Sequence, residues 1–396
     1  MRILIVNQAY HPDPAATAQH AYDLARALVA AGHQVTVVAS RSVYGTTGAA
    51  LPTRETEDGV EIRRVGLSLF GKKSLIGRIA DFGLFYVLAS VRMLTLPRHD
   101  VVICLTTPPF IGLAGWLTTR LRGGRLVSWL MDLYPEVAVA GGVMKANGPA
   151  HRLFGAINRF ILAKSARVVV LGRCMQGRIR ALGVAEDKIA LIGPWAAEET
   201  APAGRAAAGA RLTAMYSGNL GLAHDTTAFK QAMLRLKDDA GIRFVFSGGG
   251  KKRRELEAFA QAHGLTHVSF LPYLPRQQLA EQLAKADVHL ISQSPAFTGL
   301  VVPSKLYGVL AAQRPAAVVA PEETEIALVV RESGCGEVFA PDEAGGNALA
   351  DWLVRLAENP DRLRELGAAA GRAHEMAHRP KLRLGQWVGW VEGRGK

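Results

Sequence analysis

Short apolar runs that alternate with amphipathic segments dominate the hydrophobic pattern of this chain. The first run is Arg2–Val6, and after a proline-containing loop the apolar residues between Ala21 and Leu28 recur at helical spacing until Gly32 ends the segment. Similar runs predict further strands at 35–39, 101–105, 126–130 and 168–171. Strands that are apolar throughout are covered on both faces, so the pattern predicts a mostly parallel sheet with helices on both sides.

The same pattern begins again near residue 211. It predicts strands at 212–217, 242–247, 268–271, 287–292 and 316–320. Residues 196–210, between the two halves, are rich in Ala, Glu and Gly and show little periodicity, as a linker does. A chain of 396 residues also exceeds the size at which one core stops growing. We therefore expect an α/β protein of two facing Rossmann-like domains, 1–195 and 211–375.

The charge of the chain is positive and uneven. The formal net charge is +13, and residues 1–200 hold 23 Lys and Arg against 14 Asp and Glu. Such a surplus attracts nucleic acid, anionic lipid or phosphorylated substrates alike. The basic residues are not interleaved with an aromatic stacking platform, which argues against nucleic acid as a partner.

Two amphipathic stretches, 72–96 and 152–167, carry part of this charge in the first half. Charged residues interrupt both stretches before about 20 apolar residues accumulate, so neither is a transmembrane span. They fit two interpretations: helices that dock on anionic lipid, and ordinary helices whose apolar faces pack on the core.

Several chemistries lack the residues they need. Cys104, Cys174 and Cys335 lie far apart and match no CxxC spacing, which indicates neither a disulfide framework nor a zinc site. The histidines form no HxxxH or HxH spacing, and no serine-hydrolase or Walker sequence occurs. The first apolar run is too short for a signal peptide. A cytoplasmic protein without a metal or other cofactor is expected.

Two glycine turns in the second half each follow a predicted strand. Gly218, Asn219 and Gly221 follow the first strand, and Gly248 and Gly249 follow the second. Small residues at a strand-to-helix turn let backbone N–H groups approach an anion, although a tight turn alone needs no ligand.

Cationic residues stand beside two predicted helix starts. Lys251 opens a basic run after the second glycine turn, where positive charge opposes the helix dipole; a bound anion and a solvated basic face both explain it. Pro303 suits the first turn of another helix, and Ser304 and Lys305 then place a hydroxyl and an ammonium beside its free N–H groups. This segment is a candidate diphosphate clamp, with a purely structural helix start as the alternative.

Acidic residues follow a strand of the first half. Asp132 and Glu136 come after the predicted strand 126–130, at the strand end where α/β proteins place ligands. A capping role for Asp132 is the simpler alternative.

Taken together and in this order, the motifs resemble the GT-B glycosyltransferases of family four, especially the bacterial branch that builds capsule, O-antigen or colanic-acid units. The most specific matching segments are 7–12, 25–28, 32–37, 132–136, 216–221, 286–288, 302–307 and 314–315.

The resemblance implies a retaining sugar transfer from a nucleoside diphosphate sugar, preferably a UDP-sugar, without a metal. It places the donor on the second domain and a glycan acceptor, lipid-linked in this branch, on the first. It implies a final helix, 376–396, that crosses back to the first domain with Trp387 and Trp390. Catalytic candidates are Asp132 and Lys305. Donor-site candidates are Gly218, Asn219, Gly221, Gly248, Gly249, Lys251, Pro303, Ser304, Lys305 and Tyr307, and acceptor-side candidates are Ala15, Ala16, Thr17 and Glu136.

The chain departs from the family pattern at three places. Leu300 and Gly308 stand where relatives carry two Glu residues, and Asn219 stands near a family Arg. The usual glycine-rich loop after the first strand is replaced by residues 13–17. These departures keep two alternatives open: a sugar-nucleotide 2-epimerase of the same fold, and a non-catalytic scaffold bound to the membrane. The expected location is cytoplasmic, peripheral on the inner face of the membrane.

Overall fold

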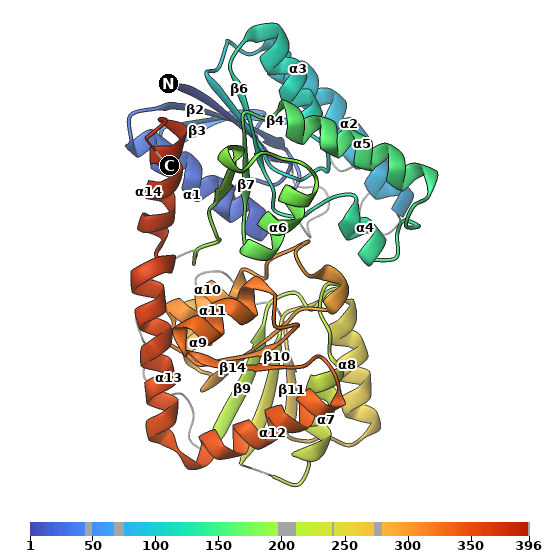
Figure 1. Cartoon of the computed structure of the whole chain (residues 1–396), viewed down its shortest axis with the longest axis vertical. Coiled ribbons are helices and arrows are strands. Elements are labelled where there is room, and N and C mark those ends of the chain that lie inside the picture. Colours follow the sequence, from blue (N-terminus) through green and yellow to red (C-terminus); the bar gives the residue numbers. More distant parts are fainter. Residues whose placement is uncertain (44–49, 67–74, 197–210, 240, 273–278, 395–396) are drawn as a thin grey trace. The chain divides into compact units, whose positions relative to one another are not determined.

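The computed structural model describes residues 1–43, 50–66, 75–196, 211–239, 241–272 and 279–394. The chain forms two compact units, one of Met1–Gly193 with Lys381–Lys396 and one of Pro194–Pro380 (Figure 1). These limits differ from the expected ones, because the first unit ends at Gly193 and the tail rejoins it at Lys381 rather than at 376. Most of the expected linker, 197–210, and the start of the first basic stretch, 72–74, lie outside the described residues.

The first unit contains an eight-stranded sheet in the order β3-β4-β2-β1-β5-β6-β7-β8. All neighbouring strands are parallel except the hairpin of β3 and β4. The strands are β1 Arg2–Val6, β2 Gln34–Ser40, β3 Arg54–Glu57, β4 Val60–Val65, β5 Val101–Cys104, β6 Arg125–Trp129, β7 Arg167–Val170 and β8 Ile189–Leu191. The helices are α1 Ala16–Ala30, α2 Leu75–Thr95, α3 Gly112–Arg122, α4 Glu136–Ala140, α5 Pro149–Lys164, α6 Arg173–Ala181 and α14 Pro380–Val391, with a 3-10 turn at Glu186–Lys188.

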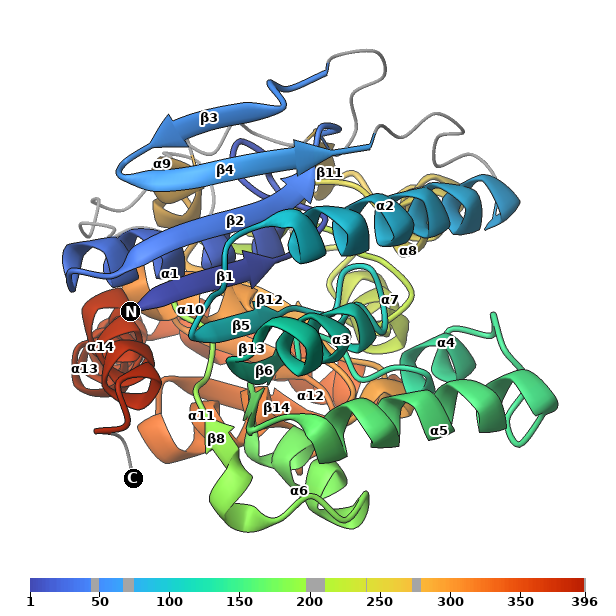
Figure 2. The same ribbon diagram turned by 90° about the horizontal axis from the view of Figure 1, so that it is seen from above.

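Helices α2, α3 and α5 cover one face of this sheet, as Figure 2 shows. Their inward residues, among them Phe85, Met93 and Ile161, pack with Leu4 and Val102 of the strands in one buried apolar cluster. Successive strand residues point to opposite faces, so the alternate strand residues are buried by helices on the other side. The strands are therefore apolar throughout, as the sequence pattern required.

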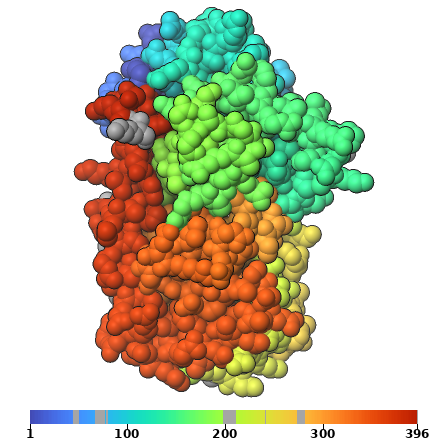
Figure 3. Space-filling model, viewed as in Figure 1, coloured from blue at the N-terminus to red at the C-terminus, as the bar shows by residue number. Residues whose placement is uncertain are grey.

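Helix α14 belongs to the other face. Ser128 hydrogen-bonds to Ser165 beside α5, so the next residue, Trp129, points away from that layer and its ring centroid lies 4.6 Å from that of Trp387. Trp387 is completely buried. In the space-filling view the red atoms of this tail adjoin the blue atoms of the first elements of the unit (Figure 3). The tail is thus an integral part of the core of the first unit.

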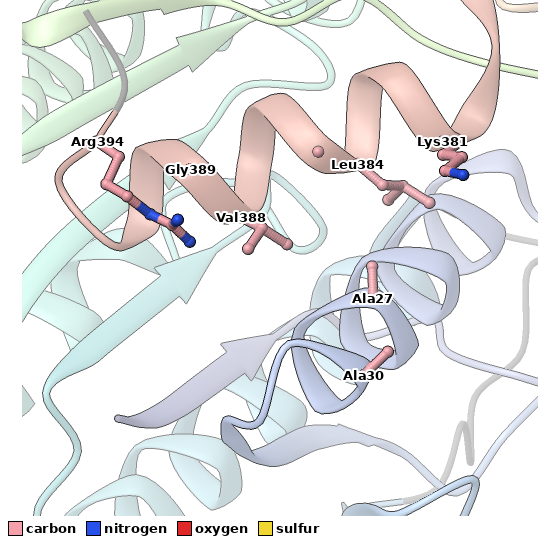
Figure 4. A pocket seen from close by; sticks show the side chains of 8 residues that line it. Ala27, Ala30, Lys381, Leu384, Val388, Gly389 and Arg394 are labelled. Atoms are coloured by element: carbon pink, nitrogen blue, oxygen red, sulfur yellow. The ribbon is translucent and has the colours of Figure 1, made fainter.

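A shallow pocket separates α14 from the C-terminal part of α1. Leu384 and Val388 point toward Ala27 and Ala30 across it (Figure 4). None of the candidate site residues lines this pocket, so it is a packing groove between two helices of the first unit.

The second unit contains a six-stranded parallel sheet in the order β11-β10-β9-β12-β13-β14. The strands are β9 Leu212–Ser217, β10 Ile242–Ser247, β11 Val268–Leu271, β12 Val288–Ser292, β13 Ala316–Val319 and β14 Gly336–Phe339. The helices are α7 Thr227–Arg235, α8 Lys251–Ala262, α9 Leu279–Ala284, α10 Lys305–Ala311, α11 Glu325–Ser333, α12 Glu343–Glu358 and α13 Pro360–Ala373, with a 3-10 turn at Pro295–Phe297 and a π turn at His374–His378. The predicted α/β fold with mostly parallel sheets is confirmed.

The order of strands reverses once in each sheet. In the first unit the chain proceeds outward from β1 on one side and continues from β5 on the other, and in the second unit the same change occurs between β9 and β12. Ligands of α/β proteins bind outside the carboxyl ends of strands at such a switch point. The fold therefore predicts a ligand-binding edge in each unit, at the carboxyl ends of the strands beside its switch point. None of the described helices is long and apolar enough to cross a bilayer.

Candidate active site

Two interlocked glycine turns follow β9 and β10 in the second unit. The Gly218 N–H donates to the Ser247 carbonyl at 2.8 Å, and the Leu220 N–H donates to the Gly249 carbonyl at 2.7 Å. Gly218 and Gly248 have φ angles of +119° and +122°. A Cβ atom on Gly248 would lie 2.2 Å from the Gly218 carbonyl oxygen. Backbone conformation thus requires glycine at both positions, and lack of space requires it at Gly248 as well.

Lys305 reaches the first of these turns from the start of α10. Its Nζ lies 3.8 Å from the centroid of the Tyr216 ring and donates to the Tyr216 hydroxyl. That hydroxyl donates in turn to the Asn219 carbonyl at 3.0 Å. A Cβ atom built on Gly218 would lie 3.8 Å from the same Nζ. The ammonium is therefore held against the glycine turn by an aromatic ring and one hydroxyl.

Burial, rather than an acidic partner among the described residues, determines the electrostatic environment of Lys305. None of the described carboxylates forms an ion pair with Lys305, and burial of its ammonium lowers the pKa of Lys305 to about 7, although the residue as a whole stays partly exposed. His224 lies beside it, with Nδ1 2.6 Å from the Ser292 carbonyl oxygen. Burial and the charge of Lys305 lower the pKa of His224 to about 3, so this ring is neutral at pH 7. The arrangement is suited to receive an anion.

Asn219, Gly221 and Ser304 lie close to the same group of residues. Asn219 is exposed, and its Nδ2 is 3.1 Å from the position of a Cβ built on Gly221. Ser304 is the N-cap of α10, but its hydroxyl makes no capping hydrogen bond, and the residue is partly exposed. The structure thus assembles most donor-site candidates around Lys305.

Three donor-site candidates have other surroundings. Helix α10 begins at Lys305, so Pro303 precedes the cap, and its expected place in the first turn is wrong. Tyr307 is 1% exposed, and its ring lies 5.0 Å from that of His378, so it serves the packing of α10. Lys251 opens α8 as expected and is exposed.

Two of the three basic residues after Lys251 are paired within α8. Lys252 lies 3.1 Å from the Glu255 carboxylate, and Arg253 lies 3.3 Å from that of Glu257. These pairs balance two of the charges without an anion, which favours the interpretation of this run as a solvated helix face.

Asp132 follows β6 at the switch-point edge of the first unit. The Thr106 hydroxyl, which follows the neighbouring strand β5, accepts the N–H groups of Met131 and Asp132, both at 3.2 Å. The carboxylate of Asp132 has no hydrogen-bond donor among the described residues, and burial raises the pKa of Asp132 to about 6. Burial and this carboxylate also raise the pKa of Tyr134. The N-cap of α4 is Pro135, so Asp132 does not cap that helix.

The acceptor-side candidates occupy two positions of the first unit. Glu136 is the first residue of α4; its Oε1 lies 4.0 Å from His151 Nε2, and its buried Oε2 has no partner among the described residues. Ala15, Ala16 and Thr17 form the start of α1, whose first turn has neither a side-chain cap nor an acidic residue. Helix α1 follows β1, and the Gln8 N–H donates to the Thr107 carbonyl at 2.7 Å, which ties that strand end to β5.

The sequence interpretation did not identify Tyr216, His224 or Thr106 as site residues. Tyr216 stands directly before the Ser-Gly-Asn turn, which is the one signal that pointed to it. His224 and Thr106 have no motif around them; they reach the site only because β9, β12, β5 and β6 are neighbours in their sheets.

Two α/β units with mostly parallel sheets are the architecture of the GT-B class. Comparison with known families agrees: residues 16–195 match the family model described as "Glycosyl transferase 4-like domain", and residues 198–371 match "Glycosyl transferases group 1". The two matches together span most of the chain, and the chain belongs to the glycosyltransferases of these families.

Individual relatives point to bacterial glycan synthesis. The chain is 28% identical over 271 residues to a protein described as probable glycosyltransferase WbjE of Pseudomonas aeruginosa, covering 66% of this chain and 67% of that one. It is 25% identical over 346 residues to the putative colanic acid biosynthesis glycosyl transferase WcaI of Escherichia coli strain K12, covering 82% and 85%. The solved structure of Anabaena HepE in complex with UDP has the same fold, with a TM-score of 0.70 at 13% identity over 99% of this chain and 100% of that one.

Proposed function

We propose that the protein transfers a sugar from a nucleoside diphosphate sugar to a glycan acceptor in the synthesis of a bacterial surface polysaccharide. The name of one relative, a putative colanic acid biosynthesis glycosyl transferase, supports the class of product, and the second unit supplies the chemistry for the donor. The observation that carries the proposal is the Lys305 ammonium, which is held at the Gly218 turn and pairs with none of the described carboxylates.

The reaction breaks the bond between the anomeric carbon and the diphosphate oxygen and forms a bond from that carbon to an acceptor hydroxyl, whose proton leaves. Negative charge grows on the departing diphosphate. A protonated Lys305 stabilises this charge more in the transition state than in the substrate, and the side-chain-free glycine turns leave room for phosphate oxygens near the backbone.

Asp132 has the complementary role in the proposal. A carboxylate whose pKa is raised toward neutrality, and which lacks a hydrogen-bond donor among the described residues, is suited to bind a sugar hydroxyl. We assign it the orientation of the acceptor or of the hydroxyl groups of the transferred sugar. The proposal further includes UDP as the nucleotide, retention of the anomeric configuration, a reaction without a metal, and a lipid-linked acceptor at the inner face of the cytoplasmic membrane.

The test is ligand-induced thermal stabilisation of the purified protein by UDP, GDP, ADP and their sugar conjugates. Specific binding to the native state raises the melting temperature by mass action. We expect one nucleoside diphosphate to stabilise the wild type clearly and to have little effect on Lys305→Ala. Lys237→Ala, which removes an exposed lysine of the same unit that is not a donor-site candidate, is the matched control and retains the shift.

A specific observation also supports the alternative of a non-catalytic scaffold. Leu300, at one position where relatives carry Glu, is 3% exposed and packs as a core residue, so no carboxylate is supplied there. If no nucleotide or sugar nucleotide changes the melting temperature, the scaffold function replaces the proposed transferase.

A further inference from the structure

Helices α2, α3 and α5 form a continuous layer on the outside of the first unit. Helix α3 lies between the other two and contacts both (Figure 2). The ring of Trp116 on α3 meets that of Phe160 on α5 in a T-shaped contact at 4.8 Å, and the Tyr86 hydroxyl of α2 donates to the Phe110 carbonyl just before α3 at 3.1 Å. The inner side of the layer is accounted for by the sheet, so its outer side is a separate surface.

The outer side of this layer is apolar. On α2, Leu84, Val87, Leu88 and Val91 follow one another at the spacing of a helix face, and Val87 and Val91 are 61% and 56% exposed. Of the fourteen large apolar side chains that are exposed among the described residues, seven lie on these three helices. We call them the outer helix face: Val87, Leu88, Val91, Leu117, Leu121, Leu153 and Phe160.

A polar outer side is the rule for a helix layer exposed to water, since its apolar stripe faces the core. Helix α2 instead has apolar residues on both sides, with Phe85, Ala89 and Met93 buried inward. Clustered exposed apolar residues of this kind mark an interaction surface.

The charge on the same helices has one sign. The three helices hold seven basic residues, and the structure describes the side chains of six of them: Arg92, Arg120, Arg122, Arg152, Arg159 and Lys164. The single acidic residue within the bounds of the three helices is Asp81, which is 6% exposed. None of the six cations forms an ion pair with a described residue, and the Lys164 ammonium lies over the Phe160 ring at 5.8 Å from its centroid.

We infer that the outer helix face docks the protein on an anionic lipid bilayer. Its apolar side chains enter the interface between headgroups and acyl chains, while the surrounding Arg and Lys residues contact lipid phosphates. A second copy of this face would bring like charges together, and nucleic acid would leave the valine and leucine side chains exposed. An anionic membrane satisfies both the apolar and the basic component.

This inference deepens the proposed function and rests on it for one point, the lipid-linked acceptor that docking would bring within reach. The surface itself is independent of the donor site, because it lies on the first unit and includes none of the candidate catalytic or binding residues. Membrane binding and donor binding can therefore fail separately.

The experiment is vesicle flotation of the full-length protein with two lipid compositions, phosphatidylcholine alone and phosphatidylcholine mixed with phosphatidylglycerol. We expect flotation with the anionic vesicles, weakened by salt, and little with the neutral ones. The double variant Arg152→Gln/Arg159→Gln is expected to bind anionic vesicles on the order of tenfold more weakly. Val87→Ser/Val91→Ser, which retains the charge, is expected to lose a similar amount through the apolar term.

Two matched controls remove the same residue types elsewhere. Met376→Ser removes an apolar side chain that is 80% exposed outside the face, and Arg235→Gln removes an exposed Arg of the second unit. Both are expected to float like the wild type. The thermal shift with the preferred nucleoside diphosphate, unchanged in all variants, shows that they are folded and that the donor site is intact.

The inference is overturned by equal flotation with neutral and anionic vesicles, or by unchanged flotation of both face variants. Concentration-dependent self-association that Val87→Ser/Val91→Ser abolishes, without any lipid binding, would identify a second copy as the occupant. A salt-sensitive complex with RNA that the arginine variant weakens would assign the face to nucleic acid instead.

Discussion

The two switch-point edges of this protein carry opposite charges but share one electrostatic principle. In the second unit burial lowers the pKa of Lys305 to about 7, and in the first unit burial raises the pKa of Asp132 to about 6. Neither group has a partner of opposite charge among the described residues. Each edge is therefore suited to a ligand that provides the missing partner: an anion for Lys305 and a hydrogen-bond donor for Asp132.

The edges differ in how they are built. The lysine is held by Tyr216 against two turns whose conformation requires glycine, whereas Asp132 follows a strand end that is fixed by the Thr106 hydroxyl, which accepts the N–H groups of Met131 and Asp132. The donor edge is thus the more constrained of the two, and changes there should have the larger effects.

The largest expected effect is on turnover. Lys305→Ala removes the cation that meets the charge developing on the diphosphate, and loss of one such group costs about 10²–10³ in kcat. The measurement is kcat at saturating donor, with Lys237→Ala, at an exposed lysine of the same unit, as a control expected to stay within a few-fold of the wild type. Unchanged turnover in Lys305→Ala would show that the leaving group is stabilised elsewhere and would remove the proposed asymmetry between the edges.

The next effect is on the stability of the second unit. Gly248→Ala places a Cβ 2.2 Å from the Gly218 carbonyl oxygen at a φ of +122°, and we expect a loss of about 2–4 kcal/mol in the free energy of unfolding. Gly264→Ala is the matched control: it also has a positive φ, +62°, but open space around the added atom, and about 1 kcal/mol is expected. Urea unfolding of both variants measures the difference, and equal losses would show that the two turns are not in steric contact.

These examples also show what could be predicted from the sequence. The apolar runs predicted the buried strands to within one or two residues, because a strand covered on both faces leaves a continuous signal. The hairpin of β3 and β4 was not predicted, although its residues alternate and Asp58-Gly59 is a typical two-residue hairpin turn. The buried Arg64 of β4 resembles a surface residue in the sequence, but it pairs with Glu55 and donates to the His11 carbonyl at 2.7 Å.

The site was predictable in part for the same physical reason. Gly218 and Gly248 could be predicted because their conformation excludes other residues, and Lys305 could be predicted because it lies in a specific motif. Tyr216, His224 and Thr106 act through contacts between strands that are neighbours only in the sheet. Such contacts depend on the strand order, which local patterns along the chain do not encode.

A smaller effect concerns the pH dependence of donor binding. The charged form of Lys305 binds the diphosphate, and in the free protein it loses its proton above about pH 7. Affinity for the nucleoside diphosphate should therefore fall by up to about tenfold per pH unit above 7, because the ligand must then recruit a proton. Calorimetric titration from pH 6 to 9 measures the slope. Lys305→Arg retains the charge throughout this range and should give a flat profile; a steep profile in that variant would assign the proton to another group.

The smallest effect belongs to the acceptor edge and has the opposite sign. The folded-state pKa of Asp132, about 6, lies above its ordinary value of 3.8, so the folded protein binds this proton more tightly than the unfolded chain does. The resulting stabilisation is complete below pH 3.8 and is lost as the pH rises through 6. At higher pH the folded protein bears the cost of a buried charge on Asp132, and Asp132→Asn removes this cost. The variant should therefore be more stable than the wild type at pH 8 but not at pH 3.5. We expect a difference of only about 1 kcal/mol at pH 8, because the carboxylate is partly exposed and solvent reduces the effect of the pKa shift. Urea unfolding at both pH values tests this. A variant less stable than the wild type at pH 8 would mean that Asp132 is already paired in the free protein, and the parallel between the two edges would fail.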